Sequence, residues 1–174
     1  LPLKPGTDIA LFNGMLHVLI SEGHIDKEYI ARHTQGFDAL AAIVKEYTPE
    51  VVAKICGLSE VSIVQAARWF GQGDSALSLY CQGLNQSAHG THNNAALIHL
   101  HLATGQIGKP GAGPFSLTGQ PNAMGGREVG GLANLMSAHR DMGNPEHRAE
   151  LARFWGVPFV PAKPGKSAVD LFKS

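Results

Sequence analysis

Residues able to bind a ligand are concentrated in a part of the sequence that carries almost no charge. Residues 75–126 contain one charged side chain, Lys109, although 16% of the 174 residues are charged. Glycines and neutral hydrogen-bonding side chains dominate this charge-poor segment, namely Gln82, Asn85, Gln86, Ser87, His89, Asn93, Asn94, Gln106, Thr118, Gln120 and Asn122. Glycines let backbone N–H groups approach a ligand closely, and amides offer both donors and acceptors. The composition indicates a large polar ligand of fixed shape or, alternatively, a packing interface with ordered water.

Arg127 and Glu128 end the charge-poor segment. A guanidinium beside a neutral, glycine-rich surface suits a small anion, because its planar fork binds two oxygens at once. A structural pair between Arg127 and Glu128 is the alternative. The sequence contains no paired carboxylates and no Ser/His/Asp spacing that would indicate a general base or a nucleophile.

The histidines suggest ligand contact rather than a metal site. His89, His92, His99 and His101 are close in sequence, but His99 and His101 lie two residues apart on an expected helix and face different directions. No carboxylate or cysteine joins them at ligand spacing. We therefore expect no protein-bound metal here, and we expect His89 to donate to a ligand from a loop. The two cysteines are too few for a disulfide framework, and Cys81 is expected in the core.

Overall charge excludes two classes of partner. Lys and Arg total 14, as do Asp and Glu, so the chain has no net charge with which to bind nucleic acid or a membrane surface. No apolar run approaches the roughly 18 residues of a membrane span. The chain opens on Leu1-Pro2-Leu3 rather than on Met, and we expect it to be an internal piece of a longer protein.

Hydrophobic periodicity and capping residues predict the elements that position these groups. Helices are expected at residues 7–22, from 26 onward, and at 37–47, 48–57 and 59–71, followed by a buried parallel strand at 76–81. A polar loop at 83–90 and a helix at 91–105 complete an α/β unit, whose ligands bind beyond the carboxyl end of the strand. Nine glycines and three prolines predict no regular structure at 105–131, and helices are expected again at 128–136 and 144–156, before a linker-like tail.

Three segments carry recognisable motifs: YCQGLNQS at 80–87, LHLATGQIGKPG at 100–111 and PFSLTGQPNAMGGREVG at 114–130. Together they resemble the molybdopterin oxidoreductases of the dimethyl sulfoxide reductase superfamily and, within them, the catalytic subunits of assimilatory nitrate reductases. Residues 3–8 and 144–148 also fit, so the resemblance covers essentially the whole chain. It implies an α/β fold: the second half of a Rossmann-like molybdopterin-binding domain with parallel strands and flanking helices at 1–112, then the start of an adjoining α/β cofactor-binding domain with a linker at 113–174.

The resemblance also implies cofactors and partners. In such enzymes two molybdopterin guanine dinucleotides hold molybdenum, and nitrate loses an oxygen atom to give nitrite. A 4Fe–4S cluster, expected in the missing N-terminal part, receives electrons from a donor protein or subunit. The rest of the same polypeptide completes the site, so this chain alone is expected to be inactive. Neither Cys56 nor Cys81 matches the cysteines that bind the cluster or the molybdenum.

Site residues follow from the resemblance position by position. Gly83, Asn85 and Gln86 would contact one pterin guanine dinucleotide, with Gln82 beside them at the strand end. Asp8 would accept hydrogen bonds from a guanine, unless it caps the first helix. Apart from Asp8, these residues lie at the strand end and in the loop of the predicted α/β unit.

A second group would lie at the molybdenum end of the cofactor. Thr118, Gly119 and Gln120 form a turn there, followed by the loop that contains Met124. Arg127 matches an arginine that holds nitrate near the metal. The resemblance therefore implies that the anion bound by Arg127 is the substrate nitrate.

Departures from the family pattern bear on branch and substrate. Many relatives carry Met where this chain has Gln82, which leaves the polarity of the pocket open. Periplasmic nitrate reductases tend to have Cys where this chain has Met124, which favours the assimilatory, cytoplasmic branch. Formate dehydrogenases share the Gly119-Gln120 turn but lack the Gly-Gly-Arg-Glu form, which favours nitrate and leaves formate as the alternative substrate. A non-catalytic nucleotide-binding module and a metal-binding histidine module are the remaining alternatives.

Overall fold

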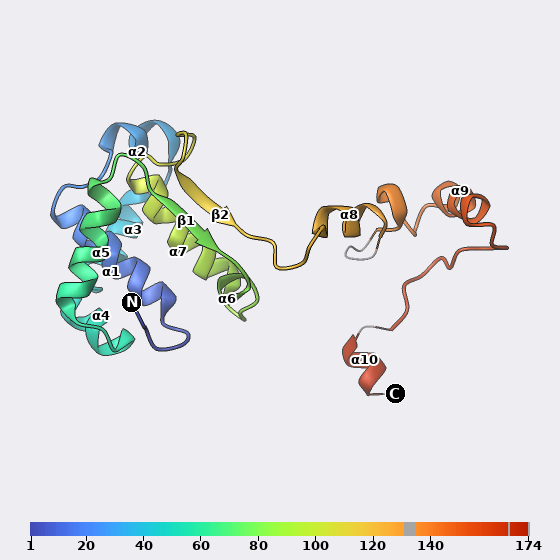
Figure 1. The fold of residues 1–174 in the computed structure, drawn as a ribbon, viewed down its shortest axis with the longest axis horizontal. Coiled ribbons are helices and arrows are strands. Elements are labelled where there is room, and N and C mark those ends of the chain that lie inside the picture. Colours follow the sequence, from blue (N-terminus) through green and yellow to red (C-terminus); the bar gives the residue numbers. More distant parts are fainter. Residues whose placement is uncertain (131–134, 167, 174) are drawn as a thin grey trace. The chain divides into compact units, whose positions relative to one another are not determined.

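The computed structural model describes residues 1–130, 135–166 and 168–173. It divides into two compact units, Leu1–Leu117 and Thr118–Ser174, which are described separately below (Figure 1). The predicted domain boundary at 112/113 is not tested by this division and stays a prediction. No helix in the described ranges is both long and apolar enough to cross a bilayer.

The first unit contains seven helices and two strands among its residues. In chain order they are α1 (Asp8–Ser21), α2 (Lys27–His33), α3 (Phe37–Val44), α4 (Pro49–Cys56), α5 (Glu60–Gln72), β1 (Leu77–Tyr80), α6 (Gln82–Asn85), α7 (Gly90–Ala103) and β2 (Gly113–Ser116). Mixed α/β structure with a parallel sheet confirms the predicted fold class.

Local capping fixes where these helices begin and end. Asp26 accepts a hydrogen bond from the backbone N–H of Tyr29 at 2.8 Å, and Ser59 accepts one from Ser62 at 3.1 Å. Gly57 ends α4 with a φ of 71°, a left-handed conformation that glycine adopts without strain. The predicted starts of α2, α4 and α5 are therefore confirmed.

α1 forms the centre of the hydrophobic core. Leu16 and Leu19 on this helix are 1% and 0% exposed. They pack with Val52 of α4, Ile63 of α5 and Leu100 of α7, and all three of these side chains are buried too. The first unit is thus a helical core that carries a small sheet beside α7 (Figure 1).

Two elements appear where the sequence predicted irregular chain. β2 pairs in parallel with β1, and Leu77 lies opposite Gly113 while Tyr80 lies opposite Ser116. Pro114 is accommodated because the N–H groups of Gly113 and Leu117 make the bonds to the β1 side, at 2.8 and 2.7 Å. The short helix α6 replaces the first part of the predicted loop at 83–90.

The second unit contains the described helices α8 (Ala123–Glu128), η1 (Ser137–His139), α9 (Pro145–Trp155) and α10 (Ala168–Phe172). α9 confirms the prediction for 144–156, since Asn144 caps it at 2.9 Å from the N–H of Glu146, and Gly156 ends it with a φ of 67°. The helix predicted at 128–136 is wrong at both ends: α8 ends at Glu128, and Met136 forms a bridge with Arg140. Residues 131–134 of that prediction lie outside the described ranges.

Candidate functional site

The carboxyl end of β1 presents polar groups from a short helix. Cys81 leaves the strand with φ −151° and ψ −142°, and α6 begins at the next residue. Leu84 is only 7% exposed and anchors α6 on the core. Because the side chains of Gln82 and Asn85 point away from that anchor, they are exposed, as is Gly83.

Asp8 and Gly83 meet at a cavity beside this strand end. The cavity has a volume of about 400 Å³ and is lined by Asp8, Phe12, Ser78, Leu79, Tyr80, Cys81, Gly83, Leu84 and Leu97. Thr7, not Asp8, is the N-cap residue of α1, and its hydroxyl donates to the carbonyl of Lys4 at 2.6 Å. Within the described ranges the Asp8 carboxylate has no partner. The alternative that Asp8 caps the helix is wrong, and the carboxylate is free to accept from a ligand.

The loop between α6 and α7 is compact, and its side chains are open to solvent. The Asn85 amide donates to the hydroxyl of Ser116 at 3.1 Å, which ties α6 to β2. Gln86 ends α6 and is exposed. His89 is the N-cap residue of α7, but its ring makes no capping bond. A Cβ added at Gly90 would collide with the backbone carbonyl of Asn85, so the chain needs glycine there.

The start of α7 is suited to an anionic group. Its first turn carries no acidic residue and no side-chain cap. The Gly90 N–H donates to the carbonyl of Ser87 at 2.9 Å, so the N–H groups of Thr91 and His92 are the ones left to a ligand. A helix N-terminus that follows a strand and a glycine-containing loop binds phosphate groups through such N–H donors.

The second group of predicted residues lies in the second unit. Thr118, Gly119 and Gln120 are exposed, and Met124 is 79% exposed on α8. Asn122 starts α8 from a left-handed conformation, φ 55°, and accepts a hydrogen bond from the N–H of Gly125 at 3.2 Å. This cap sets the direction of the helix that carries Met124.

Arg127 lies in the last turn of α8 and is exposed. Its guanidinium has no ion pair or hydrogen bond to any residue in the described part of the chain. Glu128 instead contacts His139, whose Nε2 lies 2.9 Å from the carboxylate. The structural Arg–Glu pair is therefore not what the structure shows, and the guanidinium remains available to an anion.

The amides of the charge-poor segment do not form one surface. Asn93 and Gln106 are 8% and 3% exposed, and Gln106 accepts a hydrogen bond from the N–H of Ala76 at 3.2 Å. Asn94 donates to the carbonyl of Gly90 at 2.7 Å. Gln106 thus joins the end of α7 to the start of β1, the Asn94 bond lies within α7, and Asn93 is buried in the first unit. The ligand interpretation applies only to the exposed amides.

The buried histidine of α7 is structural. His101 is 0% exposed, and its Nε2 lies 2.7 Å from the Ser78 hydroxyl. Burial lowers the pKa of His101 from its ordinary value of 6.5 to about 4. Burial also lowers the pKa of His99. No three His, Cys, Asp or Glu side chains in the described ranges are grouped as metal ligands.

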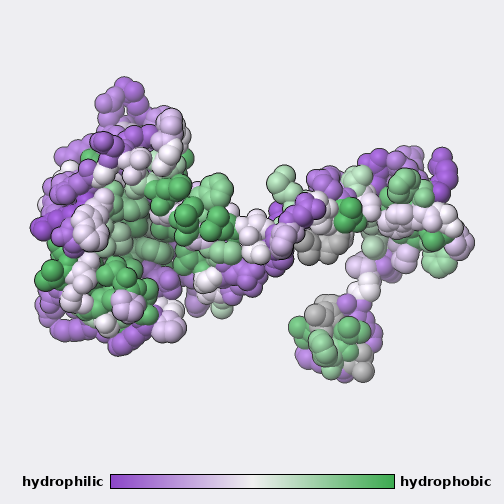
Figure 2. All heavy atoms as spheres, in the orientation of Figure 1, coloured by the Kyte–Doolittle hydropathy of each residue, from purple (hydrophilic) through white to green (hydrophobic). Residues whose placement is uncertain are grey.

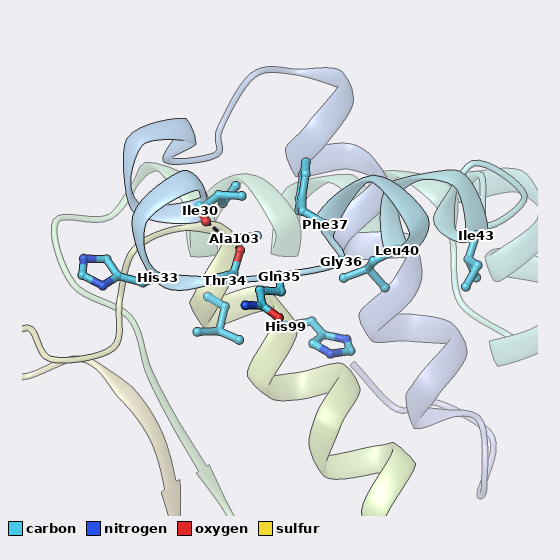
Figure 3. A pocket seen from close by; sticks show the side chains of 11 residues that line it. Ile30, His33, Thr34, Gln35, Gly36, Phe37, Leu40, Ile43, His99 and Ala103 are labelled. Atoms are coloured by element: carbon cyan, nitrogen blue, oxygen red, sulfur yellow. Dashed lines mark hydrogen bonds between the residues drawn. The ribbon is translucent and has the colours of Figure 1, made fainter.

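A second cavity, which the sequence did not indicate, lies away from these residues. It has a volume of about 490 Å³, and Figure 3 shows the side chains of α2, α3 and α7 around it. Its walls are mainly apolar, with Phe37, Leu40 and Leu102 among them, and His99 contributes a ring. None of the predicted site residues lines this cavity. The cavity could not be predicted from the sequence, because its walls come from three separate helices whose packing must be known first.

Comparison with known proteins identifies the family. The model of the molybdopterin oxidoreductase family matches residues 1–173. The chain belongs to this family. It is 46% identical over 174 residues to a nitrate reductase of Synechocystis sp., which covers 99% of this chain and 24% of that protein. This molybdopterin oxidoreductase chain thus spans about a fifth to a quarter of the length of the curated relatives it matches.

Other relatives widen the range of activities. The alpha subunit of an F420-dependent formate dehydrogenase from Methanocaldococcus jannaschii is 41% identical over 140 residues, which is 80% of this chain and 21% of that protein. Acetylene hydratase from Pelobacter acetylenicus has a similar structure, with a TM-score of 0.58 and 29% identity, over 63% of this chain and 15% of that one.

The expectation of a cytoplasmic protein is corrected by a third relative. A periplasmic nitrate reductase from Desulfovibrio desulfuricans is 40% identical over 183 residues, which covers 98% of this chain and 24% of that protein. The cytoplasmic assignment rested on Met124, a single side chain that is 79% exposed on α8. One residue does not determine the compartment of a protein.

Proposed function

We propose that this chain is part of a molybdenum enzyme that reduces nitrate to nitrite. The observation that carries the proposal is the unpaired guanidinium of Arg127 in a chain whose nitrate reductase relatives match it over 98–100% of its length. Nitrate is planar and anionic, and two of its oxygens match the fork of a guanidinium. Arg127 would hold the substrate, and Gln120 and Thr118 would supply neutral donors beside it.

The first unit would bind one molybdopterin guanine dinucleotide. The free carboxylate of Asp8 would accept from the N–H groups of a guanine, since it lines the cavity at the end of β1. A Cβ at Gly83 meets no atom within 4 Å, so the protein's own packing does not require glycine there and a ligand would. The N–H groups that begin α7 would bind the pyrophosphate, with Gln82, Asn85, Gln86 and His89 exposed around them.

When bound, the bis form of the cofactor would supply molybdenum chemistry, namely oxygen-atom acceptance from nitrate coupled to the transfer of two electrons. The residues of this chain bind and orient. Arg127 positions the anion, and the absence of acidic groups from the charge-poor segment avoids repulsion of it. Met124 offers an apolar side chain near the expected metal end.

The rest of the same polypeptide is the first proposed partner. Parallel sheets are normally covered on both faces, yet Leu77, Leu79 and Phe115 are 52%, 61% and 55% exposed on one face of the β1–β2 sheet. Figure 2 shows hydrophobic residues gathered over these two strands. We propose that the remaining polypeptide covers them and carries a 4Fe–4S cluster, which an electron donor protein or subunit reduces. This chain alone would then be inactive.

The test uses the full-length parent enzyme. We expect nitrite to form from nitrate with a reduced viologen as donor, and guanine nucleotide to be released with the pterin on acid hydrolysis. Oxidation of formate without reduction of nitrate would overturn the substrate assignment. We also propose that the nitrite is assimilated, so that deletion of the parent gene should prevent growth on nitrate as sole nitrogen source.

Formate is the second candidate substrate, because a formate dehydrogenase subunit matches 80% of the chain. Its carboxylate would bind the same guanidinium. A non-catalytic nucleotide-binding module would be supported instead if the isolated chain bound a guanine nucleotide tightly. We expect weak binding, since much of the pocket belongs to the rest of the protein.

A further inference from the structure

The acidic residue next to Arg127 is directed to a histidine. Both carboxylate oxygens of Glu128 lie 2.9 Å from the Nε2 atom of His139. Neighbouring residues on a helix point in different directions, so Glu128 faces His139 while Arg127 stays unpaired within the described ranges.

The loop that carries His139 has an unusual backbone. Ala138 and His139 both adopt left-handed conformations, with φ values of 54° and 57°. Two consecutive residues other than glycine are uncommon in this region, and such conformations persist where surrounding contacts hold them. The conformation brings the ring of His139 to the end of α8.

Contacts on both sides hold this loop. Met136 and Arg140 form an antiparallel bridge across its base. Arg140 donates to the carbonyl of Ala138 at 3.2 Å and forks onto Glu150 of α9 at 2.7 and 2.8 Å. On the other side the hydroxyl of Ser137 donates to the carbonyl of Val129 at 2.9 Å. His139 is therefore anchored between α9 and the end of α8.

We propose that His139 is a positioning residue for the anion site. It holds the Glu128 carboxylate away from Arg127 through the contact at Nε2, which leaves the guanidinium to the substrate. The inference rests on the proposed function, in which Arg127 binds an anionic substrate. A carboxylate released from His139 at the end of α8 would be free to turn towards Arg127, and its negative charge there would repel the anion.

The test is made in the full-length enzyme with His139→Ala, Glu128→Gln and the double variant. We expect His139→Ala to raise the nitrate KM about fivefold, with kcat within about twofold and molybdenum content unchanged. The double variant should return the KM to the parent value, because the charge to be controlled is gone. If the double variant keeps the raised KM of His139→Ala, the proposal is overturned. Such a result would mean that the role of His139 does not depend on the charge of Glu128 and is merely structural.

Two further variants guard against misfolding and against a general charge effect. His139→Gln keeps a donor for Glu128 and should stay within about twofold of the parent KM. Glu146→Gln removes an equal charge from α9, from a side chain with no partner in the described ranges, and should change nothing. A rise in KM for His139→Gln equal to that of His139→Ala would also overturn the proposal.

A readout without turnover separates this inference from the substrate assignment. Arginine-specific modification of Arg127 by phenylglyoxal is followed by peptide mass spectrometry with nitrate or formate as protecting anion. We expect His139→Ala to raise the half-protecting concentration about fivefold and the double variant to restore it. If formate protects Arg127 and nitrate does not, nitrate is overturned as the substrate. The proposed role of the Glu128–His139 pair is still supported in that case if His139→Ala raises the half-protecting concentration of formate. If the half-protecting concentration of the anion is the same in His139→Ala and in the parent enzyme, the proposed role of the Glu128–His139 pair is overturned.

Discussion

The Nε2 atom of His101 lies 2.7 Å from the hydroxyl oxygen of Ser78, which joins α7 to β1 inside the first unit. The ring packs edge-on against Phe70, with 4.9 Å between the ring centroids, and its Nδ1 is buried without a hydrogen-bond partner. We assign the proton to Nε2, which then donates to Ser78, because an unpaired buried acceptor costs less than an unpaired N–H. Protonation of Nδ1 would create such an N–H.

The first prediction concerns stability in acid. Burial lowers the pKa of His101 from 6.5 to about 4, so the unfolded chain binds a proton more readily than the folded one. The free energy of unfolding should therefore fall as the pH is lowered from about 6.5 towards 4, by at most about 3 kcal/mol from this residue. Urea unfolding of the full-length enzyme, followed by a probe in the first unit at several pH values, measures the fall.

His101→Gln is the matched control, because its amide still reaches for Ser78 but does not titrate. The slope between pH 6.5 and 4 should be shallower in this variant. Glu22, Glu50 and Glu150, whose pKa values are lowered by hydrogen bonds from cationic partners, lose stabilising interactions at lower pH in both proteins. Parallel pH profiles for the parent and the variant would contradict the assignment.

The second prediction separates two glycines of the same loop. Gly90→Ala forces a Cβ onto the Asn85 carbonyl and should destabilise the protein by about 2 kcal/mol, a typical cost of overpacking. Gly83→Ala meets no atom within 4 Å and should change stability by less than about 0.5 kcal/mol. Only Gly83→Ala should lose pterin without losing stability, because the ligand would occupy the space that the methyl group takes. Full pterin content in a stable Gly83→Ala variant would contradict contact at this position.

Helix boundaries were predictable because their signals are local. The caps Ser59 and Asn144 and the terminal glycines Gly57 and Gly156 act on backbone groups within one turn. β2 was missed because Gly113 and Pro114 read as chain breakers. Its pairing joins residues 36 positions apart in sequence, such as Leu77 and Gly113, and no local pattern reports such a partner.

The candidate site was predictable in its residue types but not in its contacts. Asn85 and Gln106 are both amides of the charge-poor segment, yet one is exposed and the other is 3% exposed. Gln106 is buried where it accepts from the Ala76 N–H before β1, whereas Asn85 lies on the exposed side of α6, and this difference depends on tertiary packing. The contact between Glu128 and His139 depends on two left-handed residues that are not glycine, and the sequence gives no signal for that conformation.

The third prediction concerns the anion site. Arg127→Ala in the full-length enzyme should raise the nitrate KM at least about tenfold, or about 1.4 kcal/mol, since the charge-assisted fork is lost. Arg127→Lys keeps the charge without the fork, so its nitrate KM should lie between those of the parent and of Arg127→Ala. Molybdenum content should be unchanged in both. Arg153→Ala removes an exposed arginine from α9 as a control, and an equal effect of the two alanine variants would argue against a specific role for Arg127.

The last prediction concerns the uncovered face of the sheet. The isolated 174-residue chain should bind a hydrophobic dye, because Leu77, Leu79 and Phe115 present apolar surface that the rest of the polypeptide is proposed to cover. Leu79→Gln should reduce dye fluorescence with little change in stability, since Leu79 is 61% exposed. Ile43→Gln, at the rim of the 490 Å³ cavity, tests whether the dye binds there instead. A monodisperse, cooperatively unfolding chain that binds no dye would show that the sheet face needs no cover. A loss of fluorescence in Ile43→Gln alone would place the dye in the cavity and remove this support for the partner.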